Sequence, residues 1–197
     1  MQEQLEKTIE QLHEEVSQAK KRLVEAIRGK GREEVQDYEL STTEDGKVKL
    51  SELFGDSKEL IVVHNMGQTC PYCTLWADGF NGVAGHLNRR APFVVASPDD
   101  PYTQKHFAES RGWTFRMVST KGTDFTKDMG FEPKPGAYWP GFTTFVKEDD
   151  GRIYKTASNF FGPGDDFCPT WHLFDLLEDG ANGWEPDNSY SPTIARR

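Results

Sequence analysis

The sequence lacks an excess of basic residues, and it has no long apolar run. Its 197 residues include 23 lysines and arginines against 32 aspartates and glutamates, which gives a formal net charge of −9. A nucleic-acid backbone or an anionic membrane surface needs a basic face, so neither is an expected partner. No apolar stretch approaches the roughly 20 residues of a membrane-spanning helix, and the polar N-terminus shows no signal segment. We therefore expect a cytoplasmic protein.

Cysteine is also scarce, with three in the chain. A secreted domain held together by disulfides carries more cysteines, and an even number of them. Two of the three, Cys70 and Cys73, are separated only by Pro71 and Tyr72. In a reducing compartment, such a close pair is typical of catalytic, redox-sensing or metal-binding sites rather than of structural disulfides. The segment around Cys70 is therefore the first candidate for a functional site.

The first 30 residues are predicted to form a helical arm. Between residues 2 and 28, apolar residues recur at alternating steps of four and three, the spacing of heptad positions a and d: Leu5, Ile9, Leu12, Val16, Ala19, Leu23 and Ala26. This spacing is typical of a helix that lies along its own domain, and also of one that pairs with a second subunit in a homodimer. Residues 31–47 are predicted to be a polar linker, 48–180 a folded domain and 181–197 a C-terminal tail.

The domain alternates strands and helices. Strand-like runs are rich in β-branched residues, and the helical segments follow capping residues or proline. We expect strands near 48–50 and over 60–64, 92–97, 115–119, 142–147 and 152–158, with helices over 73–88, 101–111 and 170–178. Gly79, Gly82 and Gly85 weaken the first of these helices, and their presence predicts a close backbone approach there.

The order of these elements is β-α-β-α, an insertion, and then β-β-α. It predicts an α/β protein with a thioredoxin-like fold, in which helices flank a central mixed sheet. Right-handed crossovers make the first two main strands parallel, and the hairpin is antiparallel. The strand that precedes Cys70 and the loops that carry Pro140 and Cys168 then end at the same edge of the sheet. The topology therefore predicts that these three residues share a neighbourhood.

Several segments resemble known families. The sequence CPYC, after an apolar strand and at the start of a helix, resembles the dithiol motif of glutaredoxins and of the wider thioredoxin superfamily. The run FRMVSTKGTDFTKDMGF resembles the corresponding region of peroxiredoxins. The run DGKVKLSELFGDSKELIVVHNMGQTCPYCTLWADGFNG resembles a bacterial thioredoxin-like family known as domain of unknown function 899. That resemblance extends from the first helix to about Gly180; it implies the fold and brings no reaction with it.

The CPYC segment permits thiol–disulfide exchange. A cysteine just ahead of a helix lies beside unpaired backbone N–H groups that stabilise a thiolate, and in CxxC motifs the thiol pKa commonly falls to between about 3.5 and 7.5. Pro71 fits the first helical turn. We therefore predict that Cys70 is the nucleophile and Cys73 the resolving thiol, with Thr69 and Tyr72 as supporting residues. The expected substrate is a protein or small molecule with a thiol or disulfide, and no cofactor is expected.

Two further positions are expected at this edge of the sheet. The thioredoxin-like resemblance implies that Pro140, preceded by Trp139, is a cis-proline that faces the dithiol. Cys168 allows two interpretations, a packed small residue or a third redox cysteine that exchanges with the pair. The segment GPGDD just before it resembles the loop with which glutaredoxins hold glutathione. Two interpretations, an aromatic groove around the dithiol or packing alone, apply to four further aromatic residues: Trp76, Trp139, Trp171 and Tyr138.

The residues also permit other functions. The ligand types of a tetrahedral Cys₃His zinc site are present in Cys70, Cys73, Cys168 and His172. The proline inside CPYC favours redox use, so we predict no metal. Peroxiredoxins place a threonine three residues before the reactive cysteine, and Cys70 occupies that position relative to Cys73, which disfavours a peroxidase. A third alternative is a non-catalytic partner-binding module. His64 is expected to be a core histidine rather than a proton carrier near the thiols.

Overall fold

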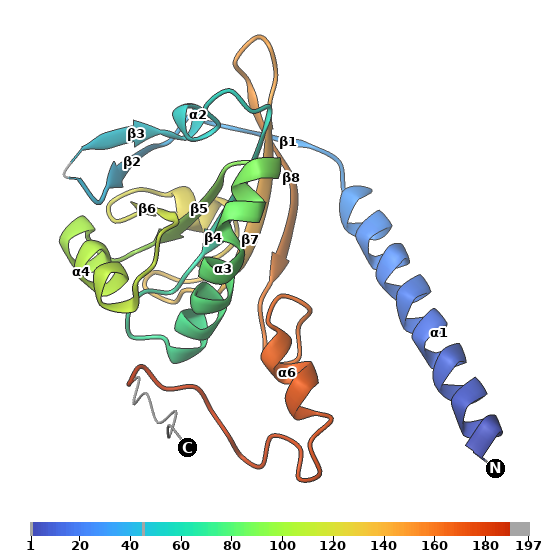
Figure 1. The fold of residues 1–197 in the computed structure, drawn as a ribbon. Helices are drawn as coiled ribbons and strands as arrows, with labels where there is room; N and C mark the ends of the chain where they lie inside the picture. Colours follow the sequence, from blue (N-terminus) through green and yellow to red (C-terminus); the bar gives the residue numbers. More distant parts are fainter. Residues whose placement is uncertain (1, 45, 190–197) are drawn as a thin grey trace.

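In the computed structural model, which describes residues 2–44 and 46–189, eight strands form one sheet. The strands lie in the spatial order β1-β8-β7-β4-β5-β6-β2-β3 (Figure 1). Along the chain they are β1 (Glu33–Val35), β2 (Glu39–Thr42), β3 (Lys47–Lys49), β4 (Glu59–His64), β5 (Phe93–Ser97), β6 (Arg116–Ser119), β7 (Gly141–Lys147) and β8 (Ile153–Phe160). The apolar strands β4 and β5 are paired on both sides, as the burial of such runs requires.

The helices of the described residues are α1 (Gln2–Arg28), α2 (Leu50–Leu53), α3 (Pro71–Arg90), α4 (Pro101–Arg111), α5 (Phe125–Asp128) and α6 (Pro169–Phe174). The longer interior helices α3 and α4 each begin at a proline, and the side chain just before that proline accepts a backbone N–H bond. The predicted elements are confirmed to within a few residues. The exception is the last helix, which ends at Phe174 instead of continuing to residue 178.

The strand directions confirm the predicted thioredoxin-like fold. β4, β5 and β6 are parallel neighbours, whereas β7 is antiparallel to β4 and β8 is antiparallel to β7. Helices α3 and α4 make the crossovers between the parallel strands, and their apolar side chains pack in the same cluster, on one face of the sheet. This arrangement places the C-terminal end of β4 and the N-terminus of α3 beside the start of β7.

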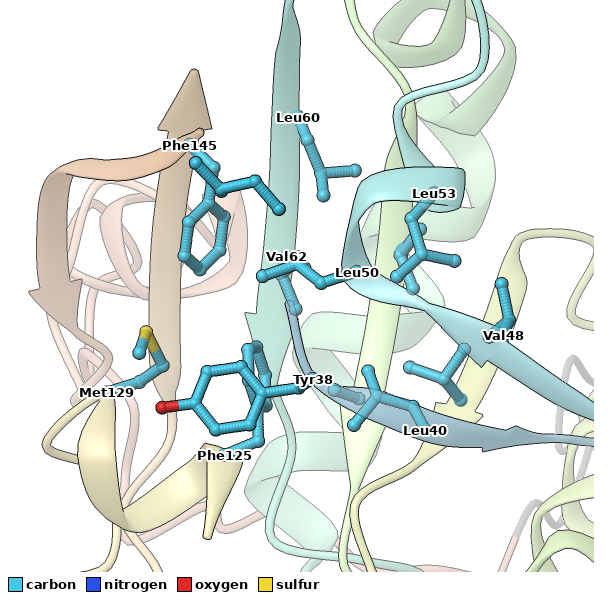
Figure 2. Packing of buried hydrophobic residues seen from close by; sticks show 14 of the residues in the cluster. Tyr38, Leu40, Val48, Leu50, Leu53, Leu60, Val62, Phe125, Met129 and Phe145 are labelled. Atoms are coloured by element: carbon cyan, nitrogen blue, oxygen red, sulfur yellow. The ribbon is translucent and has the colours of Figure 1, made fainter. Parts of the chain in front are cut away.

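Two apolar cores lie on opposite faces of the sheet because successive strand residues point in opposite directions. Leu60 and Val62 of β4 belong to the first core, which also receives Leu50 and Leu53 from α2 and Phe125 from α5 (Figure 2). The neighbouring β4 residue Val63 belongs to the second core, with side chains of α3, β5 and the loop after β8. The second core is the one that carries the CPYC helix.

The segment predicted to be a linker, residues 31–47, differs from the prediction. It contributes β1 and β2, which pair with β8 and β6 at the two sides of the sheet. Its buried side chains Tyr38 and Leu40 belong to the first core. The alternation of apolar and polar residues did not reveal these strands because they are too short, with three residues in β1 and four in β2. Of the predicted tail, residues 181–189 are described, and 190–197 lie outside the described residues.

Helix α1 stands away from the sheet (Figure 1). None of its described residues is buried, and the heptad side chains Leu5 and Leu12 are 60% and 54% exposed. Only its C-terminal half approaches the domain, where the Lys20 ammonium lies 2.7 Å from the Asp166 carboxylate. The expectation that α1 lies along its own domain therefore fails for most of the helix. None of the described helices, α1 included, is long and apolar enough to cross a membrane.

The three glycines of α3 do not serve the predicted close approach. A Cβ atom built on Gly79, Gly82 or Gly85 would have no neighbour within 4 Å. All three lie on the exposed side of the helix. They therefore carry only the conformational-entropy cost of glycine in a helix.

Replacing Gly82 by alanine is expected to stabilise the protein by about 1 kcal/mol, because the helix gains a better former and nothing must move. The free energy of unfolding in urea measures this change. The matched control is Gly112→Ala. Gly112 also has open space, but its φ is +67°, where a Cβ costs about 1–2 kcal/mol. A loss of stability in Gly82→Ala would contradict the structural reason.

Candidate active site

Cys70 is the N-cap residue of α3. Its backbone is extended, with φ −95° and ψ 104°, and its Sγ accepts the N–H of Cys73 at 3.1 Å. Pro71 takes the first helical position, as predicted, where a missing N–H leaves no bond unmade. The Cys70 carbonyl accepts the Thr74 hydroxyl at 3.0 Å. The first turn of α3 thus holds the sulfur of Cys70 against a backbone donor.

The two thiols differ strongly in acidity. The pKa of Cys70 falls to about 7, chiefly because the Cys73 side chain donates a hydrogen bond to its sulfur. Burial opposes this shift, and the backbone N–H groups of Cys73 and Tyr72 assist it. The pKa of Cys73 is raised by the same hydrogen bond and by burial. At neutral pH the pair therefore consists of a partly ionised Cys70 and a protonated Cys73.

Cys73 lies deeper than Cys70. Cys70 is 8% exposed and Cys73 is 3% exposed. The backbone N–H of Met66 lies 3.4 Å from the Cys73 sulfur, and the side-chain amide of Asn65 donates to the Cys73 carbonyl at 3.4 Å. Both cysteines are free thiols. An incoming sulfur or oxygen electrophile therefore meets Cys70 first.

Asp99, just past the end of β5, holds the loop that leads to Cys70. Its carboxylate accepts the Gln68 N–H at 2.7 Å. Gly67 has a φ of +104°, and a Cβ there would lie 2.8 Å from the Asp99 carboxylate. Burial raises the pKa of Asp99. The N-cap residue of α4 is Asp100, which accepts the Thr103 N–H. Because one carboxylate suffices for a cap, the second aspartate in the sequence was the available signal that Asp99 has another role.

Aromatic rings border the dithiol on one side. The Tyr72 ring, inside CPYC, lies 6.0 Å from the Trp171 ring, and Trp76 lies 6.3 Å from Trp171. Thr69 is exposed in the turn before Cys70. Trp139 is 50% exposed and packs edge-on against Phe160. Of the residues predicted for the aromatic groove, Trp76 and Trp171 contact each other and Tyr72, whereas Trp139 packs on Phe160.

Cys168 lies in the same apolar cluster as Trp76 and Trp171. It is 2% exposed, a free thiol, and its sulfur bonds to the Thr170 hydroxyl at 3.3 Å. Its backbone N–H is bound by Asp165, which also accepts the Trp76 indole N–H. In the GPGDD segment, Asp165 therefore makes its hydrogen bonds to groups of this chain. Cys168 is a packed residue in this structure.

Pro140 corrects one prediction. No peptide bond among residues 2–44 and 46–189 is cis, so the bond before Pro140 is trans. The trans form is favoured by about 0.5–1 kcal/mol for an X–Pro bond. Backbone hydrogen bonds hold the residues on both sides of this trans bond. The Trp139 N–H donates to the Phe131 carbonyl, and the Pro140 carbonyl accepts the Phe161 N–H. Pro140 does precede β7, whose first residue Gly141 pairs with His64 at the end of β4.

His64 is a buried core residue, as expected. Its ring stacks on Phe131 at 4.0 Å, and its Nε2 lies 2.9 Å from the Thr143 hydroxyl. Burial lowers the pKa of His64 to about 3, so the ring is neutral at physiological pH. Its side chain belongs to the face of the first core, away from α3. A role as proton carrier for the thiols has no support in this placement.

Two further observations concern the site. Within the described part of the chain, no three His, Cys, Asp or Glu side chains gather as metal ligands, so the four residues of the Cys₃His alternative do not form such a group. The C-terminal segment reaches the site: the Asn188 amide donates to the Gln68 carbonyl at 2.9 Å. Trp184 packs on Trp171 and Phe174. No sequence pattern predicted the contact between Asn188 and Gln68, because these residues are 120 positions apart.

The fold and the pair of thiols at the start of α3 define a thioredoxin-like protein with a CxxC dithiol. Residues 2–192 match the model of a family described as "Bacterial protein of unknown function (DUF899)". The chain belongs to this family, as the sequence resemblance indicated.

Curated relatives include chloroplastic peroxiredoxin Q proteins from two plants. The protein from Populus jackii is 28% identical over 136 residues, which cover 68% of this chain and 63% of the relative. The protein from Gentiana triflora is 27% identical over 122 residues, which cover 61% of this chain and 55% of the relative. The match thus spans less than two thirds of the length of either relative.

Solved structures show the same fold. The crystal structure of peroxidoxin BcpB from Mycobacterium tuberculosis is 26% identical, with a TM-score of 0.52, and the match covers 65% of this chain and 83% of that one. A PrxQ mutant from Xylella fastidiosa has a TM-score of 0.52 at 15% identity, over 65% of this chain and 83% of that one. The second likeness concerns the fold alone.

The reactivity of Cys70 is expected to follow its ionisation. Because its pKa is lowered to about 7, the rate of alkylation by iodoacetamide should rise with pH around a midpoint near 7. Mass spectrometry of the Cys70 peptide measures the rate. In Cys73→Ala, the midpoint should move upward because the main stabilising hydrogen bond is lost. Cys168→Ala is the control and should leave it unchanged; a midpoint at the value of free cysteine in the unaltered protein would contradict the geometry.

Proposed function

We propose that this protein is a thiol–disulfide oxidoreductase that uses Cys70 and Cys73. The observation that carries the proposal is the Cys70 sulfur at the N-terminus of α3, 3.1 Å from the Cys73 N–H. Backbone donors and the helix dipole stabilise a thiolate at this position, and a thiolate is the species that attacks a disulfide. The second thiol is three residues away, within the same turn of the helix.

The proposed exchange takes place in two steps. The Cys70 thiolate attacks one sulfur of a substrate disulfide, which forms a mixed disulfide and releases the other sulfur as a thiolate. The Cys73 thiol then loses its proton and attacks Cys70, which releases the second substrate sulfur and leaves a Cys70–Cys73 disulfide. The substrate gains two electrons and the protein loses two. An external dithiol restores the reduced pair by the reverse exchange.

The raised pKa of Cys73 fits its proposed role as the resolving thiol. Its main cause is the hydrogen bond that Cys73 donates to Cys70, and the Cys70 charge adds to it. Both disappear when Cys70 enters a mixed disulfide, because that sulfur is then neutral. The Cys73 proton should therefore be held until the first step is complete and released more easily afterwards.

The expected substrates are protein or small-molecule disulfides, with no cofactor. Tyr72 and Trp171 offer an aromatic surface next to Cys70 on which a substrate chain could pack. The net charge of −9 disfavours nucleic-acid and anionic membrane partners.

A second candidate activity, reduction of hydroperoxides, is supported by the similarity to proteins named peroxiredoxin Q and peroxidoxin. In that reaction the Cys70 thiolate attacks the terminal peroxide oxygen, which yields a sulfenic acid and an alkoxide that takes up a proton. The Cys73 thiol then condenses with the sulfenic acid to give the disulfide and water. The lower pKa of Cys70 supports attack by Cys70 rather than by Cys73.

Disulfide reductase activity can be measured by following the reduction of insulin with dithiothreitol as electron donor. Cys70→Ser should lower the rate at least about 100-fold, since a hydroxyl with no accessible anion replaces the attacking sulfur. Reduced Cys73→Ser protein, mixed with insulin after removal of dithiothreitol, should accumulate the mixed disulfide, visible as a mass increase on Cys70. Cys168→Ser should retain the rate. If Cys70→Ser retains full activity, the dithiol mechanism is wrong and a non-catalytic module is favoured.

The same variants separate the two candidate activities. Consumption of cumene hydroperoxide with dithiothreitol should also depend on Cys70 if the peroxidase reaction occurs. Equal dependence in both assays would assign both reactions to one thiolate. A protein that consumes hydroperoxide and leaves insulin intact would overturn the disulfide reductase proposal in favour of the peroxidase.

A further inference from the structure

Helix α1 carries an apolar stripe that its own domain does not cover. Leu5, Ile9, Leu12, Val16 and Leu23 follow the a/d heptad spacing, and each is between 47% and 60% exposed. The helix has 27 residues, which corresponds to about 40 Å. Most of the stability of a helix in water comes from packing of its apolar face. The stripe therefore requires a covering surface.

The charges of α1 are divided between its two halves. The first half is acidic, with Glu3, Glu6, Glu10, Glu14 and Glu15 against Lys7. The second half is basic, with Lys20, Lys21, Arg22 and Arg28 against Glu25. An antiparallel pair of such helices sets the acidic half of one along the basic half of the other, whereas a parallel pair sets acid against acid and base against base over most of its length.

A groove of about 860 Å³ lies beside the basic half of α1. Its apolar lining includes Leu23 and Ile27 of α1, Ile61 of β4, Phe142 of β7, and Phe167 from the loop after β8. The α1 residues that line it fall within 20–28, so the domain offers no cover to Leu5, Ile9 or Leu12. Closure of α1 onto its own sheet would thus leave the acidic half bare.

We propose that two copies of this protein form a two-fold dimer in which their α1 helices pair antiparallel. With residue 14 at the centre, Leu5 of one copy faces Leu23 of the other, and Leu12 faces Val16. The acidic half of each helix then lies along the basic half of its partner, where Glu6 and Lys20 flank the apolar stripe on the same side. The same pairing brings Leu5 and Ile9 of the second copy to the mouth of the groove. A single occupant therefore covers both apolar surfaces.

The oligomeric state of the full chain tests this proposal. Sedimentation equilibrium at micromolar protein should give twice the monomer mass. Leu12→Glu places a charge inside the stripe and should yield a monomer. Gln11→Glu places the same charge on the neighbouring residue outside the stripe and should remain a dimer. A monomeric unaltered protein, or a dimer that survives Leu12→Glu, overturns the proposal; the first result would favour closure of α1 onto its own domain.

Charge reversal tests the antiparallel direction without disturbing the apolar packing. Glu6→Lys and Lys20→Glu should each raise the dimer dissociation constant about tenfold, since each sets like charges across the helix pair. The double variant should restore the original value, and the differences should shrink in 1 M NaCl. In a parallel dimer the double variant would bring no rescue, which would contradict the proposal. Insulin reduction by these variants is measured in parallel and is independent of the outcome.

Discussion

The hydrogen bond from the Cys73 N–H to the Cys70 sulfur is the contact on which the candidate chemistry depends. It exists because Cys70 has the extended backbone of an N-cap residue while Cys73 is already helical. This bond is an ordinary N-cap contact when Cys70 is a thiol, because sulfur accepts the N–H in either form. When Cys70 is ionised, the same bond stabilises the thiolate. The same turn brings the two thiols together, so the hydrogen bond from the Cys73 thiol to the Cys70 sulfur, and secondly the burial of Cys73, separate the pKa values of two chemically identical side chains.

The rest of the fold holds that turn in place. β4 ends just before the loop that leads to Cys70. Asp99, just past the end of β5, accepts the Gln68 N–H of this loop. This contact is available because β4 and β5 are parallel neighbours, so their C-terminal ends lie side by side. The left-handed backbone of Gly67 lets the loop pass close to the Asp99 carboxylate. Asn188 adds a contact from the C-terminal segment to the same loop. The site is thus assembled from segments that are distant in the sequence.

The similarity to peroxiredoxins concerns the scaffold more closely than the reacting groups. The scaffold has the thioredoxin-like fold, with α3 at the C-terminal end of the central strand β4. In the dithiol, however, the more acidic sulfur, that of Cys70, lies at the N-cap, and the less acidic one, that of Cys73, lies inside the helix. This arrangement supports exchange of a disulfide within one turn. The fold alone does not decide between disulfide and peroxide substrates, since function depends on the site.

The sequence by itself determined the elements and the local chemistry. Periodicity located α1, the strands β4 and β5, and the helix that follows CPYC, because these depend on neighbouring residues. The tertiary structure decided what depends on contacts between distant residues. It set the trans bond at Pro140, packed Trp139 against Phe160, gave Asp99 and Asn188 their partners, and left Cys168 packed. It also showed α1 uncovered, since a heptad pattern records that a surface is apolar and says nothing of what covers it.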